Sequence, residues 1–464
     1  MIKPSTTFRL FLLVSFILIL LEIILPSEIA LFGENRLKFI SVKELFIPKK
    51  IEYAGVDIIE KRLASSKKKS KNKKGTNPAA DIEIPDSLDI QFPPGNDTLL
   101  NPFFESISSL SSSKDLIRVT HFGDSQIEGD RITSELRKNF QKKFGGCGTG
   151  ILHLVDQLNV RHSHKLSNKD NWVKIAAYGY EKRKADRENF GILASYFQTD
   201  ENKAYSEIDI EKTYVAKINE SKSEVFNIFS MNDTDSNSFQ VSQNNEVLEK
   251  IIHNNLQTSF ELKKPVSDNL NIRINNTGNK ILQGISFDCK SGITFDNVPM
   301  RGSSGTEFTK INANLLASQF KQLNTKLIIL QFGVNVVPYI LKDYSYYENL
   351  LFKQLTFLKR AAPHIPILLV SVSDMSRKEG EVYVSYPNIE LVRDAQRRAA
   401  FRAGCAFWDL YSNMGGKNSM PSWVNAEKPL ANKDYTHFTN KGANYVGQLL
   451  YNTLINRYEK YNNQ

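Results

Sequence analysis

Short apolar runs of strand length alternate with amphipathic helical segments in two parts of this chain, and this pattern limits the possible folds more than any other feature. The first such run, residues 116–122, stops at Gly123 and precedes a helical segment in which apolar side chains recur every fourth position. Strands separated by helices predict an α/β fold, a parallel sheet with helices on both faces. The later strands are expected at 326–332, 367–372 and 405–410, and the helices at 131–144, 346–360, 389–403 and 442–457.

A different pattern occupies residues 165–297. Short alternating runs, such as 238–241 and 270–274, are separated by clusters of Asn, Asp, Ser and Gly. Regularly spaced short strands with polar turns are typical of an antiparallel β-sandwich, and alternation places Phe239 in its core. Because α/β segments flank this region, we interpret it as an insertion into an α/β domain formed by residues 106–164 and 298–464.

The start of the chain has the composition of an export signal. Residues 10–25 are apolar apart from Ser15 and Glu22, and no convincing small-residue cleavage site follows them. We therefore expect residues 1–32 to hold a short tail and an uncleaved transmembrane anchor, with the rest of the chain on the periplasmic or extracellular side. The flanking basic residues do not fix the orientation, and a buried helix of a soluble domain is the alternative.

The net charge of +10 is concentrated in one segment. Eight basic residues and no acidic ones lie between Lys61 and Lys74, which leaves +2 for the rest of the chain. A run of this kind is typical of a solvated linker, so we assign residues 33–105 to a juxtamembrane segment and linker. This distribution argues against a nucleic-acid partner.

No metal or cofactor site is expected from the sequence. The histidines at 153, 162 and 164 lack carboxylate or cysteine partners at ligand spacing, and we interpret them as exposed loop residues. The cysteines allow at most one disulfide, and the first of them lies in a glycine-rich turn typical of a small buried thiol. They are Cys147, Cys289 and Cys405.

Two motifs carry the residue types of nucleophilic catalysis. Ser125 follows the first strand in the sequence His-Phe-Gly-Asp-Ser, where open α/β folds place their sites. Asp434 and His437 lie three residues apart just before the last helix. An imidazole can take the proton of a serine while a carboxylate orients the ring. Each motif alone is weak, because Gly-Asp-Ser is also an ordinary turn and a DxxH spacing is common.

Two further motifs provide hydrogen-bond donors. Asn335 comes after the strand at 326–332 in the sequence Phe-Gly-Val-Asn, and its side-chain amide can point toward a developing oxyanion. Gly305 lies in Gly-Ser-Ser-Gly-Thr, a turn that we expect to open a helix around residues 307–320. Backbone N–H groups at such a turn can donate to the same oxyanion.

Taken in chain order, the motifs around Ser125, Gly305, Asn335 and His437 resemble the four sequence blocks of the SGNH/GDSL hydrolases. The resemblance implies a flavodoxin-like three-layer α/β/α fold with Ser125 as nucleophile, His437 as base and Asp434 as the residue that orients it. It also implies an oxyanion hole formed by the Ser125 N–H, the Gly305 N–H and the Asn335 side chain. One departure is Val336, which stands where many members have Asp.

The long β insertion, and the stretch 411–423 before the histidine block, are similar to those of peptidoglycan O-acetylesterases, which carry a carbohydrate-binding-like module in this place. The resemblance implies a serine esterase that removes O-acetyl groups from cell-envelope glycan without a cofactor. An O-acetyltransferase, or an esterase for another acyl group, is the first alternative. A catalytically inactive glycan-binding protein is the second, and the retention of all four blocks argues against it.

Overall fold

The structure is a computed structural model. It describes residues 4–24, 28–30, 36–38, 53–55, 88–154, 164–167, 172–179, 186–199, 205–212, 223–231, 238–254, 256–263, 270–275 and 281–463. The chain divides into two compact units, residues 1–53 and 54–464.

The first unit contains helix α1 (Pro4–Ile24) and an antiparallel pair of short strands, β1 (Glu28–Ala30) and β2 (Arg36–Lys38). Over the described residues, no helix combines the length and the apolar character needed to cross a membrane. The predicted transmembrane anchor is therefore not supported. The lysine-rich run between Lys61 and Lys74 lies outside the described residues.

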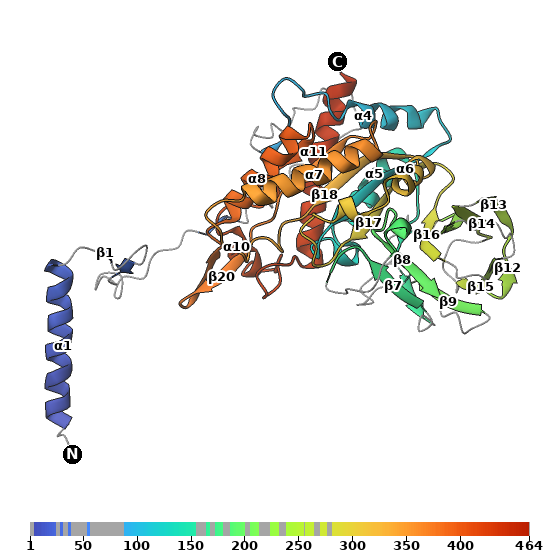
Figure 1. Ribbon diagram of the computed structural model, residues 1–464. Coiled ribbons are helices and arrows are strands. Elements are labelled where there is room, and N and C mark those ends of the chain that lie inside the picture. Colours follow the sequence, from blue (N-terminus) through green and yellow to red (C-terminus); the bar gives the residue numbers. More distant parts are fainter. Residues whose placement is uncertain are drawn as a thin grey trace. The chain divides into compact units, whose positions relative to one another are not determined.

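A six-stranded sheet, with strand order β17-β4-β18-β19-β22-β3, forms the centre of the second unit (Figure 1). The first five strands are parallel, and β3 pairs antiparallel to β22 at the edge. In sheet order the strands are β17 (Gly292–Pro299), β4 (Leu116–Gly123), β18 (Thr325–Gln331), β19 (Ile367–Val370), β22 (Ala406–Trp408) and β3 (Ile90–Gln91).

Helices cover both faces of this sheet because successive side chains of its strands point to opposite sides. In β18, Leu327 and Ile329 join one apolar core, while Ile328 and Leu330 join the other. The first core is closed by α4 (Asn101–Ser108), α5 (Thr133–Phe144) and α11 (Asn440–Asn462), and the second by α6 (Ala313–Gln322), α7 (Ser345–Ala361) and α8 (Ile389–Arg402). The predicted parallel sheet with helices on both faces is confirmed.

Shorter elements complete the described part of this unit. They are the hairpin β20 (Ser376–Glu379) and β21 (Val382–Ser385), and the helices α9 (Leu410–Asn413) and α10 (Ser419–Val424). Strand β3 and helix α4 precede Asp115, in a stretch assigned mostly to the linker. The sequence around β3 is rich in proline and gives no sign of a two-residue edge strand. Phe103 and Phe104 of α4 bury their rings in the first core.

The middle of the chain forms two antiparallel sheets over its described residues. One has the order β13-β14-β10-β16-β8-β7, with β5 also paired to β16, and the other has the order β12-β11-β15-β9-β6. The strands of the first are β13 (Lys250–Asn254), β14 (Gln257–Glu261), β10 (Val225–Ser230), β16 (Ile281–Asp288), β8 (Ser195–Thr199), β7 (Trp172–Ala176) and β5 (Gly150–Leu152). The strands of the second are β12 (Glu246–Val247), β11 (Phe239–Gln243), β15 (Leu270–Asn275), β9 (Tyr205–Lys212) and β6 (His164–Ser167).

These sheets contain the antiparallel strands expected for the insertion, and Phe239 is buried. The edges of the insertion differ from the expectation in two places. Strand β17, which starts inside the range assigned to the insertion, pairs with β4 in the parallel sheet, while β5, assigned to the α/β domain, pairs with β16. The division into separate domains, and the sandwich arrangement, stay predictions.

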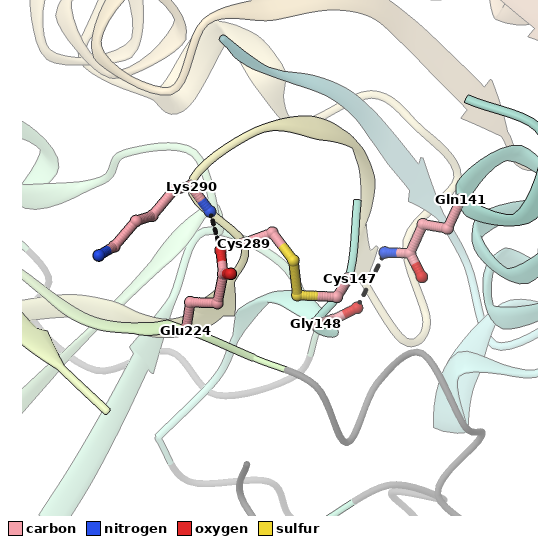
Figure 2. The surroundings of a disulfide bond; sticks show 6 residues. All are labelled: Gln141, Cys147, Gly148, Glu224, Cys289 and Lys290. Atoms are coloured by element: carbon pink, nitrogen blue, oxygen red, sulfur yellow. Dashed lines mark hydrogen bonds between the residues drawn. A yellow bond between two sulfur atoms is a disulfide. The ribbon is translucent and has the colours of Figure 1, made fainter. Parts of the chain in front are cut away.

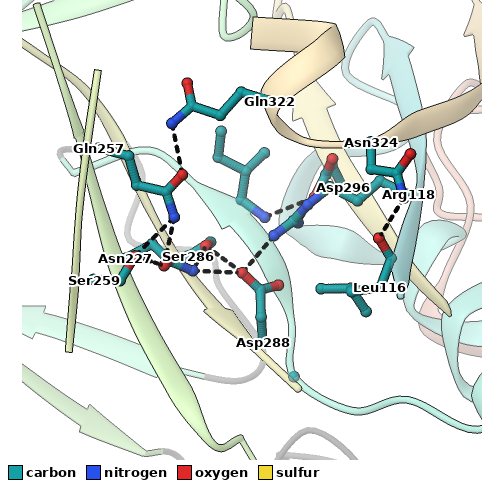
Figure 3. Close-up of polar contacts among 12 residues, drawn as sticks. Leu116, Arg118, Asn227, Gln257, Ser259, Ser286, Asp288, Asp296, Gln322 and Asn324 are labelled. Atoms are coloured by element: carbon teal, nitrogen blue, oxygen red, sulfur yellow. Dashed lines mark hydrogen bonds and ion pairs between the residues drawn. The ribbon is translucent and has the colours of Figure 1, made fainter. Parts of the chain in front are cut away.

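A disulfide and a buried ion cluster are two of the sets of contacts that join the inserted sheets to the α/β part. A disulfide links Cys147, in the loop after α5, to Cys289 after β16 (Figure 2). The expectation of a free thiol at Cys147 is therefore wrong. Gly148 allows the close approach of these segments, because a Cβ there would lie 2.0 Å from the Phe287 carbonyl oxygen. The second set is polar and surrounds Arg118 of β4, which forms ion pairs with Asp288 and Asp296 (Figure 3).

Candidate active site

Ser125 lies in the turn that follows β4, at the carboxyl edge of the parallel sheet. The turn passes close to β18, since a Cβ on Gly123 would lie 2.8 Å from the Gln331 carbonyl oxygen. The Ser125 Oγ lies 2.8 Å from the His437 Nε2, and the serine is 8% exposed. This geometry fits a serine whose proton passes to an imidazole.

His437 is oriented by Asp434 from the same loop. The His437 Nδ1 lies 2.8 Å from one Asp434 carboxylate oxygen, and the backbone N–H groups of Thr436 and His437 both donate to the other. Burial opposes ionisation of this carboxyl, but the hydrogen bonds from His437 and Thr436 outweigh it and hold the pKa of Asp434 below its ordinary value. A carboxylate at this position fixes the tautomer that leaves the Nε2 free to accept a proton.

The predicted oxyanion donors meet at Ser303. The Asn335 side-chain amide donates to the Ser303 carbonyl oxygen at 2.8 Å, and the Gly305 N–H donates to the Ser303 hydroxyl oxygen at 2.9 Å. One amide hydrogen of Asn335 is left for a ligand, whereas the Gly305 N–H would have to exchange its present partner. In the described part of the chain, the Ser125 N–H has no hydrogen-bond partner.

The helix expected to begin near residue 307 begins later. Helix α6 starts at Ala313, where the Asn312 side chain accepts from the backbone N–H groups of Asn314 and Leu315 and so caps the helix. Gly305 therefore lies in an irregular turn rather than at a helix N-terminus. Its φ of +78° and a space that a Cβ would fill, 2.9 Å from the Phe332 ring, require glycine there.

Three residues of the first motif or just after it were assigned no role from the sequence. Asp124 is buried, and its carboxylate accepts from the Gly333 N–H at 3.0 Å and the Val334 N–H at 3.3 Å. It thereby joins the nucleophile's turn to the turn that carries Asn335. Burial raises the pKa of Asp124 to about 6.

The other two residues join Ser125 to the histidine loop. The Gln126 side-chain amide donates to the Thr436 carbonyl oxygen at 2.6 Å and accepts from the Phe438 N–H at 3.3 Å, so it holds the backbone on both sides of His437. The Arg131 guanidinium donates to the carbonyl oxygens of Ser125 at 2.7 Å and Phe438 at 3.1 Å. Only their proximity to Ser125 in the sequence pointed to them.

Within the described ranges, no group of His, Cys, Asp and Glu side chains is placed to hold a metal ion. His153 differs from the expectation of an exposed residue. It is 1% exposed, with its Nδ1 2.7 Å from the Lys174 Nζ and its ring against Phe197. His162 and the side chain of His164 lie outside the described residues.

No protein-family model and no curated protein matches this chain. Among solved structures, it is similar to one described as a peptidoglycan O-acetylesterase in action, with a TM-score of 0.62 and 20% sequence identity over 77% of this chain and 96% of the other. A family 3 carbohydrate esterase from Talaromyces cellulolyticus aligns with a TM-score of 0.26 and 15% identity over 36% of this chain and 72% of that one. An acetyl xylan esterase aligns with a TM-score of 0.25 and 16% identity over 34% and 79%, respectively.

The first of these likenesses extends across most of both chains, and so includes the inserted sheets as well as the parallel sheet. The overall architecture of this chain is therefore that of the solved peptidoglycan O-acetylesterase. The α/β fold with a parallel central sheet, which the four sequence blocks implied, agrees with this likeness.

Proposed function

We propose that this protein is a serine ester hydrolase of the SGNH/GDSL type that removes O-acetyl groups from a cell-envelope glycan such as peptidoglycan. The observation that carries the proposal is the unbroken hydrogen-bond chain from Ser125 through His437 to Asp434 at the carboxyl edge of the sheet. The likeness in fold to a peptidoglycan O-acetylesterase supports the choice of substrate.

The contacts suit a two-step reaction. The Ser125 Oγ attacks the ester carbonyl carbon while His437 takes its proton, and the Asp434 carboxylate stabilises the imidazolium. Asn335 and the N–H groups of Ser125 and Gly305 stabilise the oxyanion. His437 then protonates the departing sugar oxygen. A water molecule, deprotonated by His437, attacks the acetyl-enzyme and releases acetate, which regenerates the serine.

The disulfide supports a location outside the cytoplasm. Cys147 and Cys289 are bonded across the junction with the inserted sheets, and disulfides persist mainly in oxidising compartments. Such a location is where an envelope glycan would meet the enzyme. A membrane anchor is not needed for this proposal, and it stays a prediction from the sequence.

The test is acetate release from O-acetylated peptidoglycan and hydrolysis of p-nitrophenyl acetate by the full chain. We expect Ser125→Ala to lower both rates by at least about 10³-fold. Ser112→Ala, which changes an exposed serine before β4, is the control and should keep both rates. A Ser125→Ala protein that keeps its activity would contradict the proposal. Acetylated acceptor sugar in place of free acetate would instead indicate a transferase, and glycan binding without turnover an inactive binding protein.

A further inference from the structure

The loop between Asn335 and helix α7, together with the first turn of that helix, presents large apolar side chains to solvent. Tyr339, Ile340, Leu341 and Tyr346 are 69%, 47%, 55% and 77% exposed. Scattered apolar residues are normal on a protein surface, but several together mark a surface that contacts something else. We call residues 336–346 the apolar loop.

Buried groups hold the backbone of the apolar loop in place. The Tyr344 hydroxyl, on a side chain that is almost fully buried, donates to the Tyr339 carbonyl oxygen at 2.6 Å and accepts from the Leu341 N–H at 3.2 Å. The buried Asn388 amide donates to the Val337 carbonyl oxygen at 2.8 Å. The exposed side chains are therefore carried by a fixed support, which lowers the entropy cost of binding a ligand.

Both ends of the apolar loop contact the segment that leads into Gly305. At one end, Asn335 donates to the Ser303 carbonyl oxygen, and at the other the Tyr347 hydroxyl donates to the Ser304 carbonyl oxygen at 3.3 Å. The loop is thus joined at both ends to the segment that carries Gly305, one of the proposed oxyanion donors.

We propose that the apolar loop binds the sugar ring that carries the acetyl ester, with Tyr339 as the ring on which the sugar packs. This inference rests on the proposed function. An acetyl methyl group is too small to cover several large side chains, so the alcohol part of the ester is the occupant that fits. The C–H faces of a pyranose ring are apolar and suit an aromatic surface. One lysine and one aspartate, Lys342 and Asp343, leave the loop without net charge, which favours a neutral glycan over an anionic lipid surface.

The test compares a small ester with a polymer. We expect Tyr339→Ala to raise KM for O-acetylated peptidoglycan about 10-fold, the effect of losing about 1.4 kcal/mol of binding, with kcat/KM for p-nitrophenyl acetate unchanged. Tyr339→Phe keeps the ring and should behave as the wild type. The control Ile252→Ala removes a side chain that is 47% exposed on strand β13 of the inserted sheet. It should leave the kinetic constants for both substrates unchanged.

Three results would overturn the inference: an equal loss on both substrates, no change on the polymer, or a loss confined to p-nitrophenyl esters of longer acyl chains. If the wild type hydrolyses neither substrate, the proposed function fails while the loop can still be tested. In that case, cosedimentation with insoluble peptidoglycan should be weaker for Tyr339→Ala than for the wild type. Equal cosedimentation would count against the loop.

Discussion

At the scale of single residues, the geometry of the proposed site depends on Gln126 as well as on Ser125, His437 and Asp434. His437 lies in a loop with an exposed partner, Asp434, and the loop carries no regular structure of its own. The Gln126 amide binds the backbone on both sides of the histidine, from the residue next to the nucleophile. Gln126, together with Arg131, therefore helps to set the distance between Ser125 and His437.

Replacing this side chain should affect the rate more than the stability. We expect Gln126→Met, which keeps the length but removes both hydrogen bonds to the histidine loop and one to Ser373, to lower kcat for p-nitrophenyl acetate about 10- to 100-fold, because misplacement of a catalytic group by about 1 Å has effects of this order. KM should stay within about twofold, since the side chain touches the histidine loop rather than the ester. Steady-state kinetics and thermal melting check this.

Gln141→Met is the matched control. Gln141 is as buried as Gln126 and also donates to a backbone carbonyl oxygen, that of Gly148 beside the disulfide (Figure 2), and not to the histidine loop. It should lose similar stability and keep its kcat. If both variants lose the same share of kcat, Gln126 supports the fold and does not position His437.

Asp124 gives a prediction about pH. Its pKa of about 6 lies above the ordinary value of 3.8 because the carboxyl is buried. Between these two pH values the folded protein holds a proton that the unfolded chain has released, so the contribution of Asp124 to the free energy of unfolding falls as the pH rises through this window and is constant above it. The Asp124→Asn variant has no carboxyl group at this position, so its free energy of unfolding does not fall in this way.

We therefore expect the stability of Asp124→Asn relative to the wild type to rise with pH, by up to about 3 kcal/mol between pH 4 and pH 7. Urea unfolding across this range measures the difference. The exposed Asp97→Asn variant controls for the removal of one carboxylate. A difference for Asp124→Asn that stays flat over the range would show that its carboxyl does not titrate as described.

At the scale of elements, the disulfide closes a loop of 142 residues that contains most of the inserted strands. A covalent link of this kind stabilises mainly by restricting the unfolded chain. We expect the double variant Cys147→Ser, Cys289→Ser to lose about 2–4 kcal/mol in urea unfolding. A reductant should lower the stability of the wild type and leave the double variant unchanged. Equal sensitivity of the two proteins to the reductant would contradict this.

The elements with a strong hydrophobic period were predictable from the sequence, and those fixed by tertiary contacts were not. Strand β18 has consecutive apolar residues because both of its faces are buried, and its expected bounds agree with the structure to within one residue. Strand β3 has two residues and exists only because β22 leaves an edge to pair with. The start of α6 was misplaced because Asn312 caps the helix after a short irregular segment, a choice that no periodicity reveals.

The candidate site divides in the same way. Ser125, Asp434 and His437 have side chains whose chemistry is recognisable in any context, and the fold brings them together as expected. Gln126 and Arg131 act through backbone carbonyl oxygens more than 300 residues away in the sequence. Any residue type can supply a backbone carbonyl oxygen, so the partner in such a contact cannot be recognised from the sequence. Such supporting residues therefore become visible only once the structure is known.

At the scale of the whole molecule, the inserted sheets and the α/β part belong to one compact unit, residues 54–464. Arg118, near the amino end of β4, connects them through a buried ion cluster with Asp288 of β16 and Asp296 of β17 (Figure 3). Asp288 also accepts from the side chains of Asn227 and Ser286 on the inserted sheet. The cluster thus couples strand β4 of the parallel sheet to the insertion.

Removing the guanidinium would leave two buried carboxylates without their counter-charge. We expect Arg118→Met to destabilise the protein by about 3–5 kcal/mol, the usual cost of breaking a buried ion pair from one side. The control is Lys290→Met, which removes an exposed ion pair with Glu261 next to the same junction and should change the stability far less, because solvent screens exposed ion pairs.

The form of the unfolding transition is as informative as its midpoint. If the two parts are coupled as the cluster indicates, hydrogen exchange in Arg118→Met should accelerate together in β4 and β16, and esterase activity should disappear in the same urea transition as the β signal of the inserted sheets. Early exchange confined to the inserted strands, with β4 still protected and activity retained, would show that the insertion folds independently. The buried cluster would then stabilise a contact between separate domains, and the loss in Arg118→Met would belong to that contact alone.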